Sequence, residues 1–485
     1  MPGIRGTLEI ARRALFAQQT ALEVASNNIA NANTEGYSRQ RVVMEASKPI
    51  TVGTLSLGSG VTVERIDRIR DSFVESQLRA EQQSLSNYET LEAKYSQLEA
   101  IVNEPSEMGL ASLMDKFFDS WQQLANDPQS LTMRENVSQS ATAMTGRFNT
   151  LSNQLTDMSE DIFEEFNAQV NAFNSIAEQI AILNGQLLGS GEGSVQSAQL
   201  LDRRDTLLMQ MNEIADVRIT ENERGQIKLS LGGKVFLDNT DLIKLSASSG
   251  TSDIRQLKWE DNSSGAVIGN GKLAALAEFR ETVLPGYQGR LDKLALSIAV
   301  AVNELHSQGF GLDGGTNVAF FSDSTVDAAS ISVSSVILSD KEKIAASMDG
   351  NMGDGSLALQ ISQLQDKNVV LEETASNDAI IANEGIDGVV RQILNGTAAY
   401  SSVMSFNTYY AELVSSVGRE KVGIGTYKEG QALFVNQLKS QQESVSGVSL
   451  DEEMINLIKY QRAYQAAARV IDLADQLAET VLNMV

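Results

Sequence analysis

The sequence has no cysteine, and its only histidine among 485 residues is His306. Without thiols the chain forms neither disulfides nor thiolate metal sites. A single histidine also cannot supply the ligand sets that protein-bound zinc usually has. We therefore exclude a zinc enzyme, and we expect no cofactor.

Basic residues are scarce, with 38 Lys and Arg against 63 Asp and Glu, for a formal net charge of -25. Such a charge opposes binding to a polyanion, so we expect no nucleic-acid partner. Residues 1–65 differ from the rest, because they hold seven basic residues and five glutamates, for a charge of +2. The remaining residues therefore carry -27.

Long apolar runs are also missing. The longest run, Leu294 to Val302, contains Ser297 and is far shorter than the roughly 20 residues that span a bilayer. The N-terminus carries arginines at 5, 12 and 13 but no apolar segment of the kind found in leaders. We expect no membrane span and no cleavable secretory signal.

Both ends of the chain carry an apolar seam at alternating steps of three and four residues, which is typical of paired helices. The C-terminal seam comprises Leu457, Tyr460, Tyr464, Ala467, Ile471, Ala474, Ala478, Val481 and Val485. The N-terminal seam comprises Ile4, Leu8, Ala11, Leu15, Gln18, Leu22, Ala25, Ile29 and Ala32. We predict that the two terminal helices pair with each other.

A second apolar stripe lies beside the C-terminal seam, at Val470, Leu473, Leu477 and Met484. In the simplest interpretation the seams are only the core of the chain itself. A single partner helix, however, leaves the second stripe uncovered, and uncovered apolar surface indicates a partner or self-assembly.

Between the ends, helical periodicity predicts helices at about 67–104, 110–124 and 130–188, and a return helix marked by Leu201, Leu208, Met211 and Ala215. The third would be on the order of 85 Å long. Alternation around Gly232-Gly233 predicts a β-hairpin, and Ile331 to Leu338 is a strand candidate. A helix from Leu273 should break or kink at Pro285-Gly286.

These elements predict a mainly α protein with a β-rich insertion, in the α+β class, elongated and multidomain. Residues 1–40 and 446–485 form a terminal helical domain. Residues 41–215, 271–308 and 346–445 form a helical-bundle body with short strands near its start. Residues 216–270 and 309–345 form a small outer β-rich domain.

The sequence gives only weak evidence for catalytic or metal-binding residues. His306 ends an apolar helix, and we find no nucleophile-elbow motif for it to serve. The segment Asp349 to Gly355 resembles a calcium loop but has Gln360 where a glutamate is needed. The pairs Glu164-Glu165 and Glu372-Glu373 fit a solvated acidic surface better than an acid/base site.

Two runs of residues resemble the signatures of a known family. Residues 27–40 (NNIANANTEGYSRQ) resemble the N-terminal signature of bacterial flagellar rod, hook and hook–filament junction proteins. Residues 449–471 (SLDEEMINLIKYQRAYQAAARVI) resemble the C-terminal signature. The long helical middle, the segment Leu200 to Leu208 and the β insertion are most similar to the junction members, which belong to the hook-associated proteins.

This resemblance implies a non-enzymatic structural subunit of the flagellum that joins hook to filament. The implied partners are hook protein, the second junction protein (hook-associated protein 3), further copies of the chain in a ring or helical layer, and a cytoplasmic export chaperone at the C-terminal region. The implied location is extracellular, on the flagellum, after type III export without leader cleavage. Two alternatives stay open, namely a hook or rod subunit and a secreted enzyme that travels with the flagellum.

The seams and signatures together predict the residues of the assembly interface. They are Leu8, Leu15, Leu22, Asn28, Ile29, Asn31, Thr34, Gly36, Tyr37, Leu457, Tyr460, Gln461, Tyr464, Ile471, Leu473, Leu477 and Val481.

Overall fold

The computed structural model describes residues 2–34, 36–52, 55–102, 107–190, 193–221, 226–246, 254, 256–261, 265–322, 327–372, 375–397, 400 and 402–483. These residues form two compact units. The first comprises Met1–Asn87, Asn167–Ala274 and Lys428–Val485, and the second comprises Tyr88–Phe166 and Ala275–Tyr427. The units do not coincide with the three predicted domains, which remain a proposal.

The first unit contains the two ends of the chain, as helices α1 (Pro2–Ala30) and α12 (Leu450–Asn483). After α1 come β1 (Gln40–Ala46), β2 (Ile50–Val52), β3 (Leu55–Leu57) and β4 (Val61–Arg68), in two antiparallel pairs, β1 with β4 and β2 with β3. Helix α5 (Val195–Ile214) also belongs to this unit. The predicted short strands after the first helix are therefore confirmed.

Two small antiparallel sheets form the β insertion of the first unit. One has the order β5 (Val217–Glu221), β6 (Ile227–Leu231), β7 (Lys234–Asp238), β8 (Asp241–Leu242). The other has the order β11 (Ala266–Val267), β10 (Gln256–Trp259), β9 (Leu245–Ser246). Leu231 pairs with Lys234 across Gly232 and Gly233, which have φ of +57° and +88°. Two residues with positive φ match the twist of a tight hairpin, so the predicted β-hairpin is confirmed.

Three long helices contribute residues to both units, namely α2 (Ser72–Val102), α4 (Leu131–Gly189) and α11 (Phe406–Ser446), and so does the short α6 (Lys272–Glu278). Helix α4 is the predicted long helix, with 59 residues. The apolar face expected for it is buried from Val137 to Ile180. Its length therefore comes from an uninterrupted apolar stripe that has core contacts along these turns.

The second unit is mainly helical. It contains α3 (Leu110–Asn126), α7 (Leu284–His306), α8 (Ser335–Ser339), α9 (Ser356–Ser362), α10 (Ala375–Leu394) and the pair β12 (Val370–Leu371) and β13 (Val403–Met404). Short 3-10 turns lie at Lys341–Lys343 and Gln363–Gln365. The predicted mainly α class with small antiparallel sheets is confirmed.

The helix predicted from Leu273 is not broken at Pro285-Gly286 but has an irregular turn before them. Helix α6 (Lys272–Glu278) continues into α7 through a π-helical turn at Phe279–Val283, directly before Pro285. A proline cannot donate the regular helical hydrogen bond, and the π turn keeps the helix continuous at this point.

The strand predicted at Ile331 to Leu338 is wrong, because residues 335–339 form α8. Only an isolated bridge between Val333 and Phe321 is strand-like there. The β-branched residues favoured a strand, but the chain buries Ile337 in a helical turn instead.

Candidate functional site in the terminal helix pair

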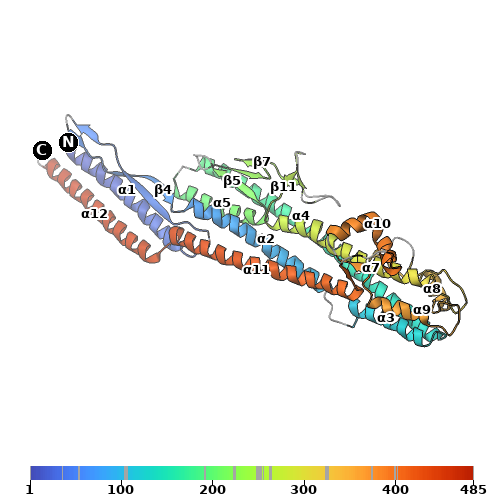
Figure 1. The fold of residues 1–485 in the computed structure, drawn as a ribbon. Helices are drawn as coiled ribbons and strands as arrows, with labels where there is room; N and C mark the ends of the chain where they lie inside the picture. Colours follow the sequence, from blue (N-terminus) through green and yellow to red (C-terminus); the bar gives the residue numbers. More distant parts are fainter. Residues whose placement is uncertain are drawn as a thin grey trace. The chain divides into compact units, whose positions relative to one another are not determined.

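Helices α1 and α12 lie side by side and run in opposite directions, with the two chain ends together (Figure 1). On α12 the seam residues Ala467 and Ala474 are buried, and Leu457, Tyr460 and Ile471 are half-buried. The predicted pairing of the terminal helices is confirmed. Small alanines at the centre of the seam allow the two backbones to approach closely.

The buried face of α1 differs from its predicted seam. Its buried side chains are Ala11, Ala17, Ala21, Val24, Ala25 and Asn28. The predicted residues Leu8, Leu15, Leu22 and Ile29 are only half-buried. The difference arises because α1 packs against β1 and β4 as well as α12, so the face that it buries is wider than one seam.

A buried polar cluster joins the start of α12 to the end of α1 and the start of β1. We call the cluster of Asn28, Tyr37, Arg39, Gln40 and Glu453 the clasp. The Asn28 amide donates to the Gln40 carbonyl at 2.9 Å and to Glu453 Oε2 at 3.1 Å. Its oxygen accepts from the Gln40 backbone N–H at 3.0 Å and from the Tyr37 hydroxyl at 2.8 Å. One side chain thus connects both ends of the chain.

Arg39 supplies the charge that a buried Glu453 needs. The Glu453 side chain is 3% exposed, and its Oε1 lies 2.7 Å from an Arg39 guanidinium nitrogen. Arg39 also pairs with Glu452 at 2.8 Å, and its backbone N–H donates to the Ser446 carbonyl at 3.0 Å. Burial lowers the pKa of Arg39, but its bonds to Glu452 and Glu453 outweigh this and the pKa is raised. A buried carboxylate is tolerated only with such a partner.

Tyr37 stays neutral within the clasp. Burial, followed by the charges of Asp202 and Glu453, raises the pKa of its hydroxyl. A neutral hydroxyl keeps its proton and can go on donating to Asn28.

The segment Leu200 to Leu208, on α5, lies against the loop that follows α1 and contains Gly36 and Ser38. Gly36 has a φ of +80°, and a Cβ there would lie 2.6 Å from Thr206 Oγ1. Arg68 pairs with Asp202 at 2.9 Å and with Asp205 at 2.6 Å. Glycine is therefore required at position 36 by both the backbone conformation and the close approach of α5.

Asn31 and Thr34 form the turn that ends α1. The Asn31 amide donates to Asn27 Oδ1 at 2.6 Å, and the Thr34 hydroxyl donates to Asn31 Oδ1 at 3.3 Å. These bonds replace the helical hydrogen bonds that are lost at the end of α1.

The remaining predicted interface residues belong to α12. Leu473 and Leu477 are exposed, Tyr464 is 38% exposed, and Gln461 is exposed. Val481 is in α12, but its side chain lies outside the described part, as do Met484 and Val485. The sequence prediction omitted three members of the clasp, namely Arg39, Gln40 and Glu453. All three lie within the two signature runs, which was the available signal.

His306 has a structural role. It is 1% exposed, its Nδ1 lies 2.7 Å from the Val318 carbonyl, and its Nε2 accepts from the Ala345 backbone N–H at 2.8 Å. Burial lowers the pKa of His306 to about 4. The neutral ring, with its proton on Nδ1, joins two loops to the end of α7.

The other chemical candidates also have structural explanations. The Asp354 carboxylate accepts from Ser356 Oγ at 2.7 Å and from the Met348 backbone N–H at 2.9 Å. These bonds lower its pKa to about 2 and occupy oxygens that a calcium ion would need. Glu165 pairs with Lys94, and Glu373 lies outside the described residues.

Neither a metal site nor a membrane-spanning helix is found among the described residues. No group of three or more His, Cys, Asp or Glu side chains there is placed to hold a metal ion. No helix in the same part of the chain has the length and apolarity to cross a bilayer.

Comparison with known proteins places these features in a family. Residues 95–321 match the helical domain of flagellar hook-associated protein FlgK. Residues 8–37 match a flagella basal body rod protein family, and residues 440–484 match the flagellar basal body rod FlgEFG protein C-terminal family. Flagellar hook-associated protein 1 of Bacillus subtilis is 30% identical, over 98% of this chain and 97% of the relative. The chain belongs to the flagellar hook-associated protein 1 family.

Two further similarities agree. Flagellar hook-associated protein 1 of Escherichia coli is 27% identical, over 98% of both chains. The flagellar hook junction protein FlgK of Burkholderia pseudomallei shares the fold, with a TM-score of 0.61 and 15% identity over 76% of this chain and all of that one. In this hook-associated protein the clasp joins the two terminal family matches, since Asn28 and Tyr37 lie in one and Glu453 in the other.

Proposed function

We propose that this hook-associated protein is the structural subunit that joins the flagellar hook to the filament, and that it assembles through its terminal helix pair. The observation that carries this proposal is the uncovered stripe on α12. Val470, Leu473 and Leu477 are 40%, 59% and 51% exposed, although α1 already covers the neighbouring seam. Exposed apolar stripes on a helix are typical of surfaces that another chain covers.

The predicted interface residues divide into two roles in this proposal. Leu473, Leu477 and the half-buried leucines of α1 contact neighbouring subunits. Asn28 and Tyr37 instead form hydrogen bonds within the chain, where they fix the end of α1 to the start of α12. This rigid connection keeps the apolar stripe in one orientation, which lowers the entropy cost of assembly.

Partners and location follow from the same proposal. Hook protein lies on one side of the assembled layer and the second junction protein, hook-associated protein 3, on the other. Before assembly a cytoplasmic chaperone covers the C-terminal region, and the chain leaves the cell through the flagellar type III apparatus without leader cleavage. The terminal domain of residues 1–40 and 446–485 builds the tube of this assembly.

The deciding experiment is a deletion of the gene in a flagellated host. We expect cells that build hooks of normal length, lack filaments and release filament monomers into the medium. Complementation with the intact chain should restore filaments. Loss of the hook itself would instead identify a hook or rod subunit and overturn the proposal.

We infer in addition that the chain is not an enzyme. His306 is buried with both ring nitrogens bonded, as described above. A cavity of about 610 Å³ beside β4 and α5 is lined by Arg41, Arg65, Arg68 and Arg70 among others. Three of these arginines are held in ion pairs, for example Arg65 with Asp67 at 2.8 Å. Hydrolysis of peptidoglycan or peptides by the purified chain, abolished by His306→Gln, would contradict this inference.

A further inference from the structure

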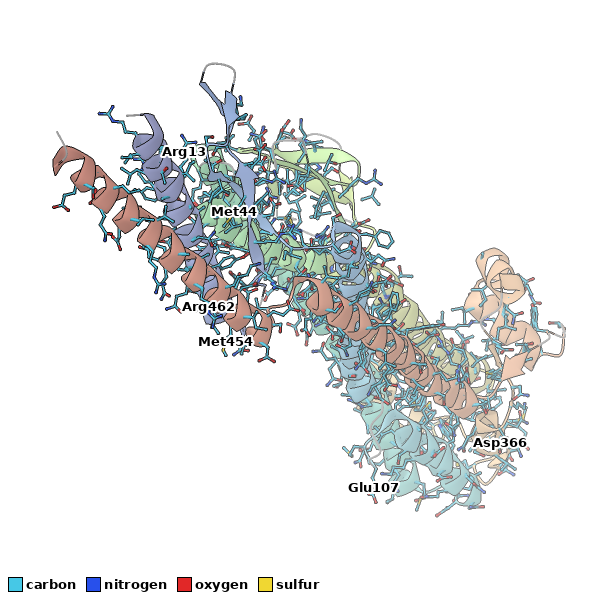
Figure 2. All side chains as sticks on the ribbon, turned by 90° about the vertical axis from the view of Figure 1, so that its left-hand side faces the viewer. Arg13, Met44, Glu107, Asp366, Met454 and Arg462 are labelled. Atoms are coloured by element: carbon cyan, nitrogen blue, oxygen red, sulfur yellow. The ribbon has the colours of Figure 1, made fainter. Side chains whose placement is uncertain are left out.

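The cavity of about 610 Å³ beside β4 and α5 lies entirely within the first unit, and we call it the arginine cavity. Four arginines line it, namely Arg41, Arg65, Arg68 and Arg70. Arg41 comes from β1, the strand on which Figure 2 labels Met44. Among the described lining residues only Asp67 is acidic. In a chain with a formal net charge of -25, such a local excess of positive charge favours an anionic ligand.

Two of the four arginines are committed to carboxylates of α5. Arg68 lies 2.9 Å from Asp202 and 2.6 Å from Asp205. Arg70 also lies 2.6 Å from Asp205. The Arg68 side chain is 8% exposed, so it is enclosed together with its partners. These two arginines therefore form a fixed wall of the cavity, and their charge is already balanced.

The other two arginines keep hydrogen-bond donors for a ligand. In the described part of the chain the Arg41 side chain is exposed and forms no hydrogen bond or ion pair. Arg65 donates to both oxygens of Asp67, at 2.8 and 3.3 Å, and pairs with Glu64 at 3.1 Å. These bonds use one hydrogen on each guanidinium nitrogen, so the second hydrogen of each terminal nitrogen remains available.

Arg41 and Arg65 lie on one face of the β1–β4 pair. Arg41 is opposite Asp67, and Arg65 lies two positions from Asp67, so the two arginines are diagonal neighbours. Diagonal neighbours are about 7–8 Å apart, which long side chains can bridge.

Gly193 allows the start of α5 to close this side of the cavity. Its carbonyl accepts from the Ile66 backbone N–H at 2.8 Å. A Cβ at position 193 would lie 2.5 Å from Arg65 Cβ, so only glycine permits this approach. The two arginines that keep free donors thus border one space between β1, β4 and α5.

We propose that the arginine cavity binds a phosphate group, free or on a small phosphate ester, through Arg41 and Arg65. A guanidinium fork donates two parallel hydrogen bonds to an oxyanion. A carboxylate presents one edge of two oxygens to a single fork, whereas a phosphate has further oxygens for a second fork. The volume of the cavity is in the range of small-molecule sites and leaves room for the rest of an ester. This inference does not depend on the proposed assembly function.

Titration of the purified full chain tests the proposal. The probes are inorganic phosphate, glucose 6-phosphate and acetate, added near neutral pH at low and constant ionic strength, because salt screens exposed charges. Calorimetry should show saturable binding of a phosphate probe, and the same probe should raise the unfolding temperature. Acetate should do neither. Tighter binding of glucose 6-phosphate identifies an ester as the ligand, and tighter binding of inorganic phosphate identifies the free ion.

Arg41→Gln should weaken phosphate binding at least about tenfold, because it removes charge-assisted hydrogen bonds. Its unfolding temperature without phosphate should equal that of the parent, since Arg41 is exposed. Arg41→Lys should recover only part of the affinity, because lysine has no planar fork. Arg218→Gln removes the same charge from an exposed position on β5 outside the cavity, and this control should bind phosphate like the parent.

Three outcomes would overturn the inference. They are the absence of saturable phosphate binding, equal binding of acetate and phosphate, and equal weakening by Arg41→Gln and Arg218→Gln. The last result would show general attraction to the charge of the chain instead of a site. None of these results bears on incorporation into flagella, so failure here is distinguishable from failure of the proposed function.

Discussion

At the scale of single residues, Asn28 has the most connected side chain of the clasp. It satisfies both backbone groups of Gln40 and also bonds Tyr37 and Glu453. A buried amide with four hydrogen bonds has no alternative partner when one of them is lost. The clasp therefore orders the end of α1, the start of β1 and the start of α12 as one group.

Asn28→Ala should destabilise this group by about 2–3 kcal/mol, because it removes the buried hydrogen bonds of Asn28 to the Gln40 backbone, to Tyr37 and to Glu453 Oε2, while Glu453 keeps its ion pair with Arg39. Hydrogen exchange should accelerate in α1, β1 and the first turns of α12 and stay unchanged in α7. Asn33→Ala, at an exposed position, is the control. Unchanged protection in all three elements would show that the clasp does not order the ends.

His306 makes the stability of the chain depend on pH. The pKa of His306 is about 4 in the folded chain, against an ordinary value of 6.5 that we assign to the unfolded chain. As the pH falls, the unfolded chain therefore takes up a proton on His306 before the folded chain does. The neutral ring makes its full contribution to the free energy of unfolding above pH 6.5. About 3 kcal/mol of that free energy is lost as the pH falls from 6.5 to 4. The measurement is denaturant unfolding of the chain and of His306→Gln at pH 7 and pH 4. The stability difference between them should shrink at pH 4, and a constant difference would contradict this role.

At the scale of elements, the pairing of α1 and α12 depends on a narrow seam of small and half-buried side chains. Ile471→Asp places a charge in that seam and should weaken the pair by on the order of 2 kcal/mol. The variant should be exported but not incorporated into flagella, and protease should cut α12 faster than in the parent. Gln476→Asp puts the same charge on the exposed side of α12 and should behave like the parent.

The fold of most elements was predictable from periodicity. Helix α4 was recognisable because its apolar face repeats without interruption from Val137 to Ile180, and the hairpin because Gly232-Gly233 permits positive φ. The structure of Ile331 to Leu338 was not predictable in this way, since short β-branched runs fit a strand or a buried helical turn equally well. Only the burial of Ile337 decided between them.

At the scale of the whole molecule, the terminal helix should be dispensable for the rest of the fold. Deletion of residues 450–485 removes α12 but no strand of the β insertion and no helix of the second unit. We expect cooperative unfolding of the remainder and complete loss of incorporation, measured by immunoblot of isolated flagella. Normal incorporation of the truncated chain would refute assembly through the terminal pair.

The sequence by itself determined the helical class, the pairing of the ends and the family, because heptad seams and long signatures are local patterns. The clasp was decided only by tertiary structure. Asn28 and Glu453 are 425 positions apart, and no spacing rule connects them. The same holds for the stripe on α12 that pointed to assembly. Sequence indicated which residues are apolar, but only the position of α1 showed that Leu473 and Leu477 stay uncovered.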